Sequence, residues 1–136
     1  MALADRIKKS EPKAKANPAE FFGKMFQLRD ILHTRHLHPT SPGQLGSGWE
    51  HKVLNDLYDD ILDLTDSIIE GYQGKHGLLK IQIPASEYNN IVAYLEDFVK
   101  FVENSYSMFP ETWIQNELDN VQREIYSALY KLKYLK

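Results

Sequence analysis

Apolar residues recur at intervals of three and four positions along most of the chain, and this spacing constrains the fold more than any other feature. Side chains spaced in this way lie on one face of a helix. The most regular run follows Pro110 and consists of Ile114, Leu118, Val121, Ile125, Leu129 and Leu132. Two earlier runs consist of Leu54, Leu57, Ile61, Leu64 and Ile68, and of Ile91, Leu95, Phe98 and Val102. Each run predicts an amphipathic helix with one buried face.

A further helix is predicted near the N-terminus. Asn17 is a favourable N-cap, Pro18 suits the first helical position, and Glu20 completes a pattern like a capping box. Apolar residues occupy two faces of this helix, with Phe21, Met25, Leu28 and Leu32 on one and Phe22 and Phe26 on the other. We therefore expect the helix to have two partners, and another subunit is a candidate for the second.

Breaking and capping residues predict the bounds of the second helix. The stretch 38–48 contains two prolines and three glycines, which interrupt the chain. Ser47 and Glu50 form a capping box, so the helix should begin near residue 48 and continue to about residue 72. Gly71 and Gly74 are expected to mark its end.

The segment between the second and third helices is long. Ser86 is expected to cap the third helix, and Pro110 to occupy the first turn of the fourth. From Gly74 to Ser86 the chain reaches about 40 Å at roughly 3.3 Å per residue, which is similar to the length of a helix of about 25 residues. The segment can therefore run along the bundle and start the third helix parallel to the second. A slack loop in an up-and-down bundle is the alternative.

Together these features predict an all-α fold, a four-helix bundle with a long crossover between its second and third helices. Such a crossover resembles that of ferritin-like bundles. A chain of 136 residues can form one domain with a single core. We expect a flexible basic arm at residues 1–18 and the bundle domain at 19–136.

The expected arm differs from the body in charge. It has a net charge of +3, from Arg6, Lys8, Lys9, Lys13 and Lys15 against Asp5 and Glu11. Because the whole chain carries −3, the remainder carries −6. Such an arm suits contact with DNA or with an acidic protein, and a solubilising tail without a target is the alternative.

Composition restricts the setting and the class of function. The chain has no cysteine, which excludes disulfides and thiolate metal sites. No apolar run approaches the roughly 20 residues that cross a bilayer, and the chain does not open with a signal-peptide pattern. We therefore expect a location in the cytoplasm, or in a particle assembled there, without a membrane partner. No nucleophile–base pair, phosphate loop or dinucleotide fingerprint supports a hydrolase or transferase.

The stretch from His51 to Glu70 carries carboxylates as well as an apolar face. Its acidic stripe consists of Asp59, Asp63, Asp66 and Glu70. Carboxylates three or four positions apart on a helix repel each other, so either the stripe faces water or a cation neutralises it. Asp66 and Glu70 lie about 140° and 180° around the helix from Ile61. A metal bound there would sit on an outer face or between two molecules.

Four residues in this part of the chain, His36, His51, Asp66 and Glu70, resemble in order and spacing the metal site of the miniferritins, the DNA-binding proteins from starved cells. The resemblance covers about residues 28–72. It implies that His36 and His51 of one subunit and Asp66 and Glu70 of its two-fold mate bind iron(II) for oxidation to iron(III). It also implies an oligomer whose basic arm contacts DNA.

Stretches around these residues, such as "EHK" and "DLTDS", also resemble those of small uncharacterised bacteriophage proteins. This second resemblance implies an alternative function, a non-enzymatic phage structural or interaction protein built on a ferritin-like bundle. Three positions differ from the miniferritin pattern, namely Leu37, Asn55 and Gly71. The first stands where that family carries a tryptophan.

Other aromatic residues and histidines have simpler interpretations. The run from His33 to His38 is either a metal-binding cluster or a helix end, and for His33 and His38 we favour the helix end, where imidazoles suit the negative end of the helix dipole. Trp49 and Trp113 lie in the first turns of predicted helices and are expected to be packing anchors. A half-buried packing rim is predicted for three tyrosines four positions apart, Tyr126, Tyr130 and Tyr134.

Overall fold

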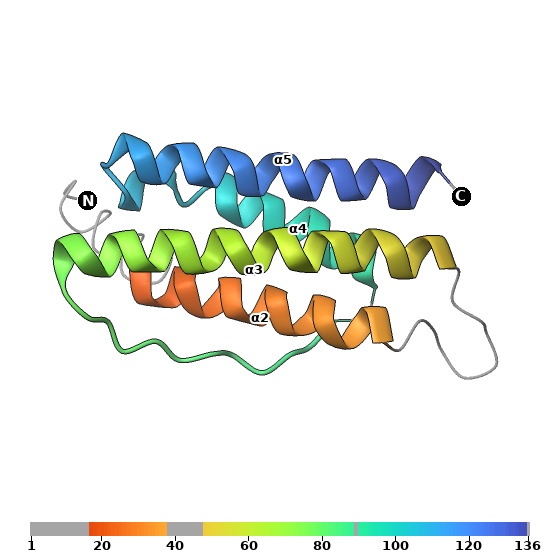
Figure 1. The fold of residues 1–136 in the computed structure, drawn as a ribbon, viewed down its shortest axis with the longest axis horizontal. Helices are drawn as coiled ribbons and strands as arrows, with labels where there is room; N and C mark the ends of the chain where they lie inside the picture. The colour runs from red at the N-terminus through yellow and green to blue at the C-terminus, as the bar shows by residue number, and fades with distance from the viewer. Residues whose placement is uncertain (1–16, 38–47, 89, 136) are drawn as a thin grey trace, which may run out of the picture.

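The computed structural model describes residues 17–37, 48–88 and 90–135, and the regular elements within these ranges are all helical. The four α-helices lie side by side along the long axis of the molecule (Figure 1). They are α2 (Pro18–Leu37), α3 (Gly48–His76), α4 (Ile91–Glu103) and α5 (Thr112–Tyr134), and one short 3-10 helix, η1 (Tyr106–Met108), precedes α5. The predicted all-α class with four helices is confirmed for the described part of the chain.

Contacts near the helix ends establish the direction of α3, α4 and α5. Trp49, at the start of α3, donates from Nε1 to the carbonyl oxygen of Lys131 near the end of α5, at 3.1 Å. Glu96, in the first half of α4, pairs with Lys133 near the end of α5 at 3.2 Å, and Glu103, at the end of α4, accepts from Tyr126 further back along α5 at 2.7 Å. Both α3 and α4 therefore run opposite to α5, and they run in the same direction as each other (Figure 1).

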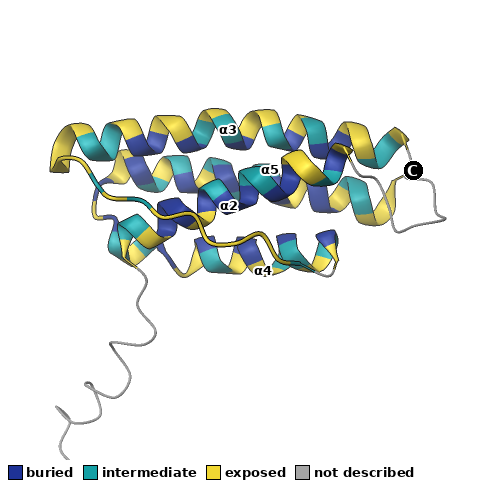
Figure 2. Ribbon diagram, turned by 90° about the horizontal axis from the view of Figure 1, so that it is seen from below, coloured by how far each residue is buried: buried dark blue, intermediate teal, exposed yellow. Residues whose placement is uncertain are grey.

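The extended segment 77–88 leads from the end of α3 to the start of α4 and passes along α2 (Figures 1 and 2). Its backbone approaches α2 closely at Gly23, where a Cβ atom would lie 2.2 Å from the carbonyl oxygen of Gln82. One turn further along α2, the Gln27 side chain donates to the carbonyl oxygen of Ala85 at 2.6 Å. The missing side chain at position 23 thus allows the segment to lie against the helix.

The core lies between the four helices, which turn their buried faces toward one another (Figure 2). Burial of the predicted stripes on α3, α4 and α5 is confirmed, apart from two half-buried residues, Leu64 and Leu132. Both predicted faces of the first helix are used within the chain. Phe21 stacks on Phe101 with ring centroids 5.4 Å apart, and the buried Phe22 meets the edge of Tyr72 at the same separation.

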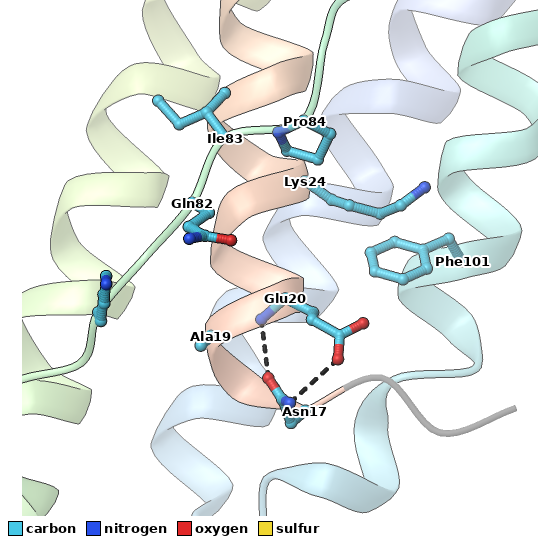
Figure 3. A pocket seen from close by; sticks show the side chains of 9 residues that line it. Asn17, Ala19, Glu20, Lys24, Gln82, Ile83, Pro84 and Phe101 are labelled. Carbon is cyan, nitrogen blue, oxygen red and sulfur yellow. Dashed lines mark hydrogen bonds between the residues drawn. The ribbon is translucent and has the colours of Figure 1, made fainter. Parts of the chain in front are cut away.

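The predicted N-terminus of the first helix is confirmed (Figure 3). The backbone N–H of Glu20 donates to Oδ1 of Asn17 at 2.9 Å. In return, the Asn17 side-chain amide donates to the Glu20 carboxylate at 3.0 Å. This reciprocal pair satisfies one of the backbone N–H groups that a helix leaves open at its start.

The predicted end of the second helix at Gly71 and Gly74 is wrong. The helix α3 continues to His76, and Gly77 follows it with a φ angle of +95°. Gly71 lies inside the helix, and Trp113 packs against it, so that a Cβ there would lie 2.8 Å from Cζ3 of that ring. This glycine makes room for a side chain of another helix.

Two predicted helix starts are displaced. Ser86 does not cap the third helix, because it lies in the extended segment and the N-cap of α4 is Asn90. The Asn90 side chain accepts from the backbone N–H of Ala93 at 2.9 Å. The N-cap of α5 is Glu111, so Pro110 precedes the helix instead of occupying its first turn.

Several predictions concern residues outside the described ranges. They are the cap at Ser47, the loop 38–47, His38, and the basic arm with Arg6, Lys8, Lys9, Lys13 and Lys15. Contact between this arm and DNA or an acidic protein stays a prediction. In the ranges that the structure does describe, no helix combines the length and the apolar character needed to span a membrane.

Candidate functional site

Two of the four predicted ligands, His36 and His51, lie beside each other where α2 ends and α3 begins. Their ring centroids are 5.1 Å apart. His36 is buried, with 8% of its surface exposed, whereas His51 is exposed. An ion pair between Arg35 Nη2 and Glu50 Oε1, 2.8 Å apart, joins the same two helix ends. The packing of α2 on α3 therefore sets the position of both imidazoles.

Each imidazole of this pair turns Nδ1 toward a backbone carbonyl. The Nδ1 atom of His51 lies 2.6 Å from the carbonyl oxygen of His36, and Nδ1 of His36 lies 3.2 Å from that of Leu32. A carbonyl oxygen only accepts, so both Nδ1 atoms carry the hydrogen and donate. In the neutral imidazole the lone pair then lies on Nε2. Metal-binding histidines have this arrangement, because the second hydrogen bond sets the tautomer and the ring orientation.

A third histidine, His33, and a tyrosine, Tyr58, adjoin the pair. A histidine cluster over residues 33–38 was one of two interpretations of the sequence, whereas the contact with the tyrosine was not predicted. The ring centroid of His33 lies 5.5 Å from that of His36 and 4.8 Å from that of Tyr58. His33 and His36 are three positions apart on α2. This spacing places both side chains on one face of the helix, and it is the sequence feature that points to their contact. Tyr58 comes from α3, and no local pattern points to it.

The other two predicted ligands, Asp66 and Glu70, lie far from the histidines of the same chain. They follow His51 by 15 and 19 positions on the continuous helix α3, which separates them from it by about 22 Å and 28 Å. Both are exposed, and neither makes a hydrogen bond or ion pair with another described residue. No group of three or more histidine, aspartate or glutamate side chains in the described ranges can hold a metal ion. A site containing all four residues therefore requires a second copy of the chain.

The region that matches a known protein family begins in the first turn of α3, the helix that carries His51, Asp66 and Glu70. Residues 49–132, more than half of the 136, fit a family described as a family of unknown function (DUF5856). The chain belongs to the DUF5856 family. No curated protein and no solved structure matches it. The DUF5856 region contains His51, Asp66 and Glu70, whereas His36 precedes it.

The DUF5856 region also contains a buried carboxylate, Glu111, at the start of α5. Its Oε2 atom accepts from Lys75 at 2.8 Å and from His76 at 2.6 Å, both near the end of α3. Hydrogen bonds from Lys75 and then His76 lower the pKa of Glu111 to about 2. Its Oε1 atom is buried without a hydrogen-bond partner in the described part of the chain. This contact fastens the end of α3 to the start of α5.

Two further carboxylates in the DUF5856 region, Asp60 and Glu124, face each other across a groove between α3 and α5. The groove has a volume of about 240 Å³. Partial burial, followed by the hydrogen bond and the repulsion between the two carboxylates, raises the pKa of Asp60. Sequence analysis did not find this pair, because its members lie on helices distant in sequence.

Figure 3 shows a hollow between the start of α2, the extended segment 77–88 and α4. Its volume is about 430 Å³, and Lys24 Nζ lies 5.1 Å from the centroid of the Phe101 ring in its wall. None of the four predicted ligands lines it. Its polar side chains are all exposed, so the hollow has no buried polar group to orient a ligand.

Proposed function

We propose that two copies of this chain assemble a miniferritin-like iron site, with His36 and His51 from one copy and Asp66 and Glu70 from the other. The observation that carries this proposal is the orientation of the adjoining histidine rings. Both Nδ1 atoms face backbone carbonyls, which leaves the two Nε2 atoms for a metal ion. A mixed set of imidazoles and carboxylates with open positions suits iron(II).

The acidic stripe on α3 supplies the charge that such a site needs. Asp66 and Glu70 lie on neighbouring turns of α3 and have no partner in the described part of the chain. Their mutual repulsion is relieved when a dication binds. Iron is the substrate in this proposal: it binds as iron(II), and peroxide or oxygen oxidises it to iron(III).

The spacing along α3 suggests the symmetry of the assembly. If two α3 helices pair antiparallel about a two-fold axis, His51 of one copy lies level with the Asp66–Glu70 turn of the other. The axis then passes about midway between these positions, near Asp59. The proposal includes a ferritin-like arrangement of the four helices. The parallel direction of α3 and α4, which the segment 77–88 joins, supports this arrangement.

Complementation between two variants tests the proposal. His51→Ala and Asp66→Ala are each expected to abolish anaerobic iron(II) binding, measured by isothermal titration calorimetry and elemental analysis. Dimers that contain one chain of each variant keep one intact site, because an unaltered histidine of one chain meets an unaltered carboxylate of the other. When the two variants are mixed and reassembled, each mixed dimer should therefore bind up to half as much iron as a wild-type dimer.

Asp63→Ala is the matched control, since it removes a carboxylate from the same stripe but outside the proposed ligand set. It should leave the iron stoichiometry unchanged. A wild-type protein that binds no iron would overturn the proposal. Equal losses in the control and the two variants would also contradict it, because iron would then bind to the acidic stripe as a whole.

A further inference from the structure

The hollow between the start of α2, the extended segment 77–88 and α4 joins apolar surface to positive charge (Figure 3). Two lysines line it, Lys24 from α2 and Lys80 from the extended segment. Its volume of about 430 Å³ is within the usual range of ligand pockets, so the hollow has room for a partner's side chain. Its apolar wall consists of Ala19, Ile83, Pro84 and Phe101.

The two lysines of the hollow have no carboxylate partner. Neither Lys24 nor Lys80 forms an ion pair with another described residue. Glu20 lies one turn before Lys24 on α2, but its carboxylate accepts from the Asn17 amide at 3.0 Å, while Lys24 Nζ lies over the Phe101 ring. These ammonium groups border the hollow although residues 19–136 carry a net charge of −6. A partner that brings carboxylates complements both of them.

The extended segment offers its backbone as well as its side chains. It is held at Leu79, whose N–H donates to Gln73 Oε1 at 3.0 Å, and at Ala85, whose carbonyl accepts from Gln27 at 2.6 Å. Between these anchors, residues 80–83 make no hydrogen bond with another described residue. Free N–H and carbonyl groups on an extended chain pair readily with a second extended chain. They can orient a peptide, even though the hollow has no buried polar side chain.

The groove between α4 and α5 differs in this respect. The tyrosines that border it are 49%, 56% and 69% exposed, in the order Tyr126, Tyr130 and Tyr134. The predicted half-buried rim is therefore wrong at its outer end. Polar groups at this groove are already paired within the chain, since Lys133 donates to Glu96 at 3.2 Å and the Tyr126 hydroxyl donates to Glu103 at 2.7 Å.

We propose that the hollow binds an acidic peptide in an extended conformation. The peptide pairs with the backbone of residues 80–83, places an apolar side chain against Phe101, and sets carboxylates against Lys24 and Lys80. Charge favours such a partner over the chain's own segment 1–18, which carries +3 and is repelled by the two lysines. None of the proposed iron ligands lines the hollow, so this inference does not rest on the proposed function.

Fluorescence anisotropy tests the proposal on the metal-free, full-length protein. The probe is a fluorescein-labelled peptide, Ser-Glu-Ser-Leu-Ser-Glu-Ser, in which leucine and both glutamates lie on one side of an extended chain. The wild-type protein should bind it saturably. Lys24→Glu/Lys80→Glu should weaken binding on the order of tenfold or more, because both carboxylates of the peptide then meet like charges. Lys52→Glu/Lys133→Glu makes the same change of charge on α3 and α5, outside the hollow, and should leave binding unchanged.

A second variant tests the apolar part of the hollow without altering charge. Ala19→Phe narrows the hollow and should also weaken binding of the peptide. Unchanged binding by this variant, with native helix content in circular dichroism, would place the peptide elsewhere and contradict the proposal. His51→Ala should bind the peptide as the wild-type protein does, which separates this inference from the iron site.

Three further outcomes would overturn the inference. The first is a wild-type protein that shows no saturable binding of the glutamate peptide. The second is equal weakening by the two double variants, or equal binding of a probe with lysine in place of both glutamates, because charge at the hollow would then select nothing. The third is a change in the sedimentation of the Lys24→Glu/Lys80→Glu protein alone, which would assign the hollow to a second copy of the chain.

Discussion

Gly23 lies directly against the carbonyl group of Gln82, so closely that a Cβ atom at position 23 would come within 2.2 Å of the carbonyl oxygen. Real Cβ atoms do not approach an oxygen this closely, so the glycine is a requirement of the path that segment 77–88 takes over α2. The Gln27 side chain, which bonds to Ala85 at 2.6 Å, holds the same segment one turn further on. Together these contacts determine where the chain can return to start α4.

Gly23→Ala should therefore destabilise the protein. The segment or the helix must shift to accept the methyl group, at a cost of about 1–3 kcal/mol in the free energy of unfolding. Gly74→Ala is the matched control, since it lies inside α3 with nothing within 4 Å of its Cβ position. It should stabilise by roughly 0.5–1 kcal/mol through helix propensity. Urea unfolding followed by circular dichroism measures both, and equal effects would contradict the close approach.

The start of α4 at Asn90 leads to a second prediction. Asn90→Ala removes the side-chain acceptor of the Ala93 N–H and should cost about 1 kcal/mol of stability. Ser86→Ala alters an exposed residue of the extended segment and should be nearly neutral. The comparison discriminates between the two possible caps, and a larger loss for Ser86→Ala would place the start of the helix four residues earlier.

Glu111 should make stability depend on pH in the acid range. Its pKa falls from 4.5 to about 2 in the folded protein, chiefly through hydrogen bonds from Lys75 and His76. A depressed carboxylate pKa stabilises the fold above the unfolded-state pKa, and this contribution disappears as the pH falls through the folded-state value. Glu111→Gln should therefore be less stable than wild type at pH 7, with the difference closing between about pH 4.5 and pH 2. Glu87→Gln, at an exposed position, should show no such convergence in urea titrations.

Asp60 should have the opposite effect. Partial burial, and then the facing Glu124, raise its pKa, so that its charged form is disfavoured in the folded state. Asp60→Asn should increase stability at pH 7 by about 0.2–0.5 kcal/mol, a small gain because the site is largely exposed. The gain should vanish below the usual aspartate pKa of about 4, where both states are protonated. Asp59→Asn, at the adjacent exposed position of α3, is the control, and an equal gain from it would show a general effect of charge.

Predictions from the sequence held where the cause is local. The cap at Asn17 depends only on Asn17 and on Glu20 three positions later, so the four residues 17–20 are enough to predict it. The end of α3 was misjudged at Gly71 because the reason for this glycine is Trp113, on another helix. The cap of α4 was misjudged because Ser86 is an equally acceptable capping residue, and the position of the segment over α2 leaves Asn90 as the one that is used.

By itself, the sequence determined the helices and their buried faces, because a period of 3.6 residues is a property of neighbouring positions. It also determined that His51, Asp66 and Glu70 follow one another along a single helix, and hence that they are far apart within one chain. Only the tertiary structure decided that His36 and His51 adjoin, with His33 and Tyr58 beside them. Those contacts arise from the packing of α2 on α3, which depends on side chains distributed over the whole core.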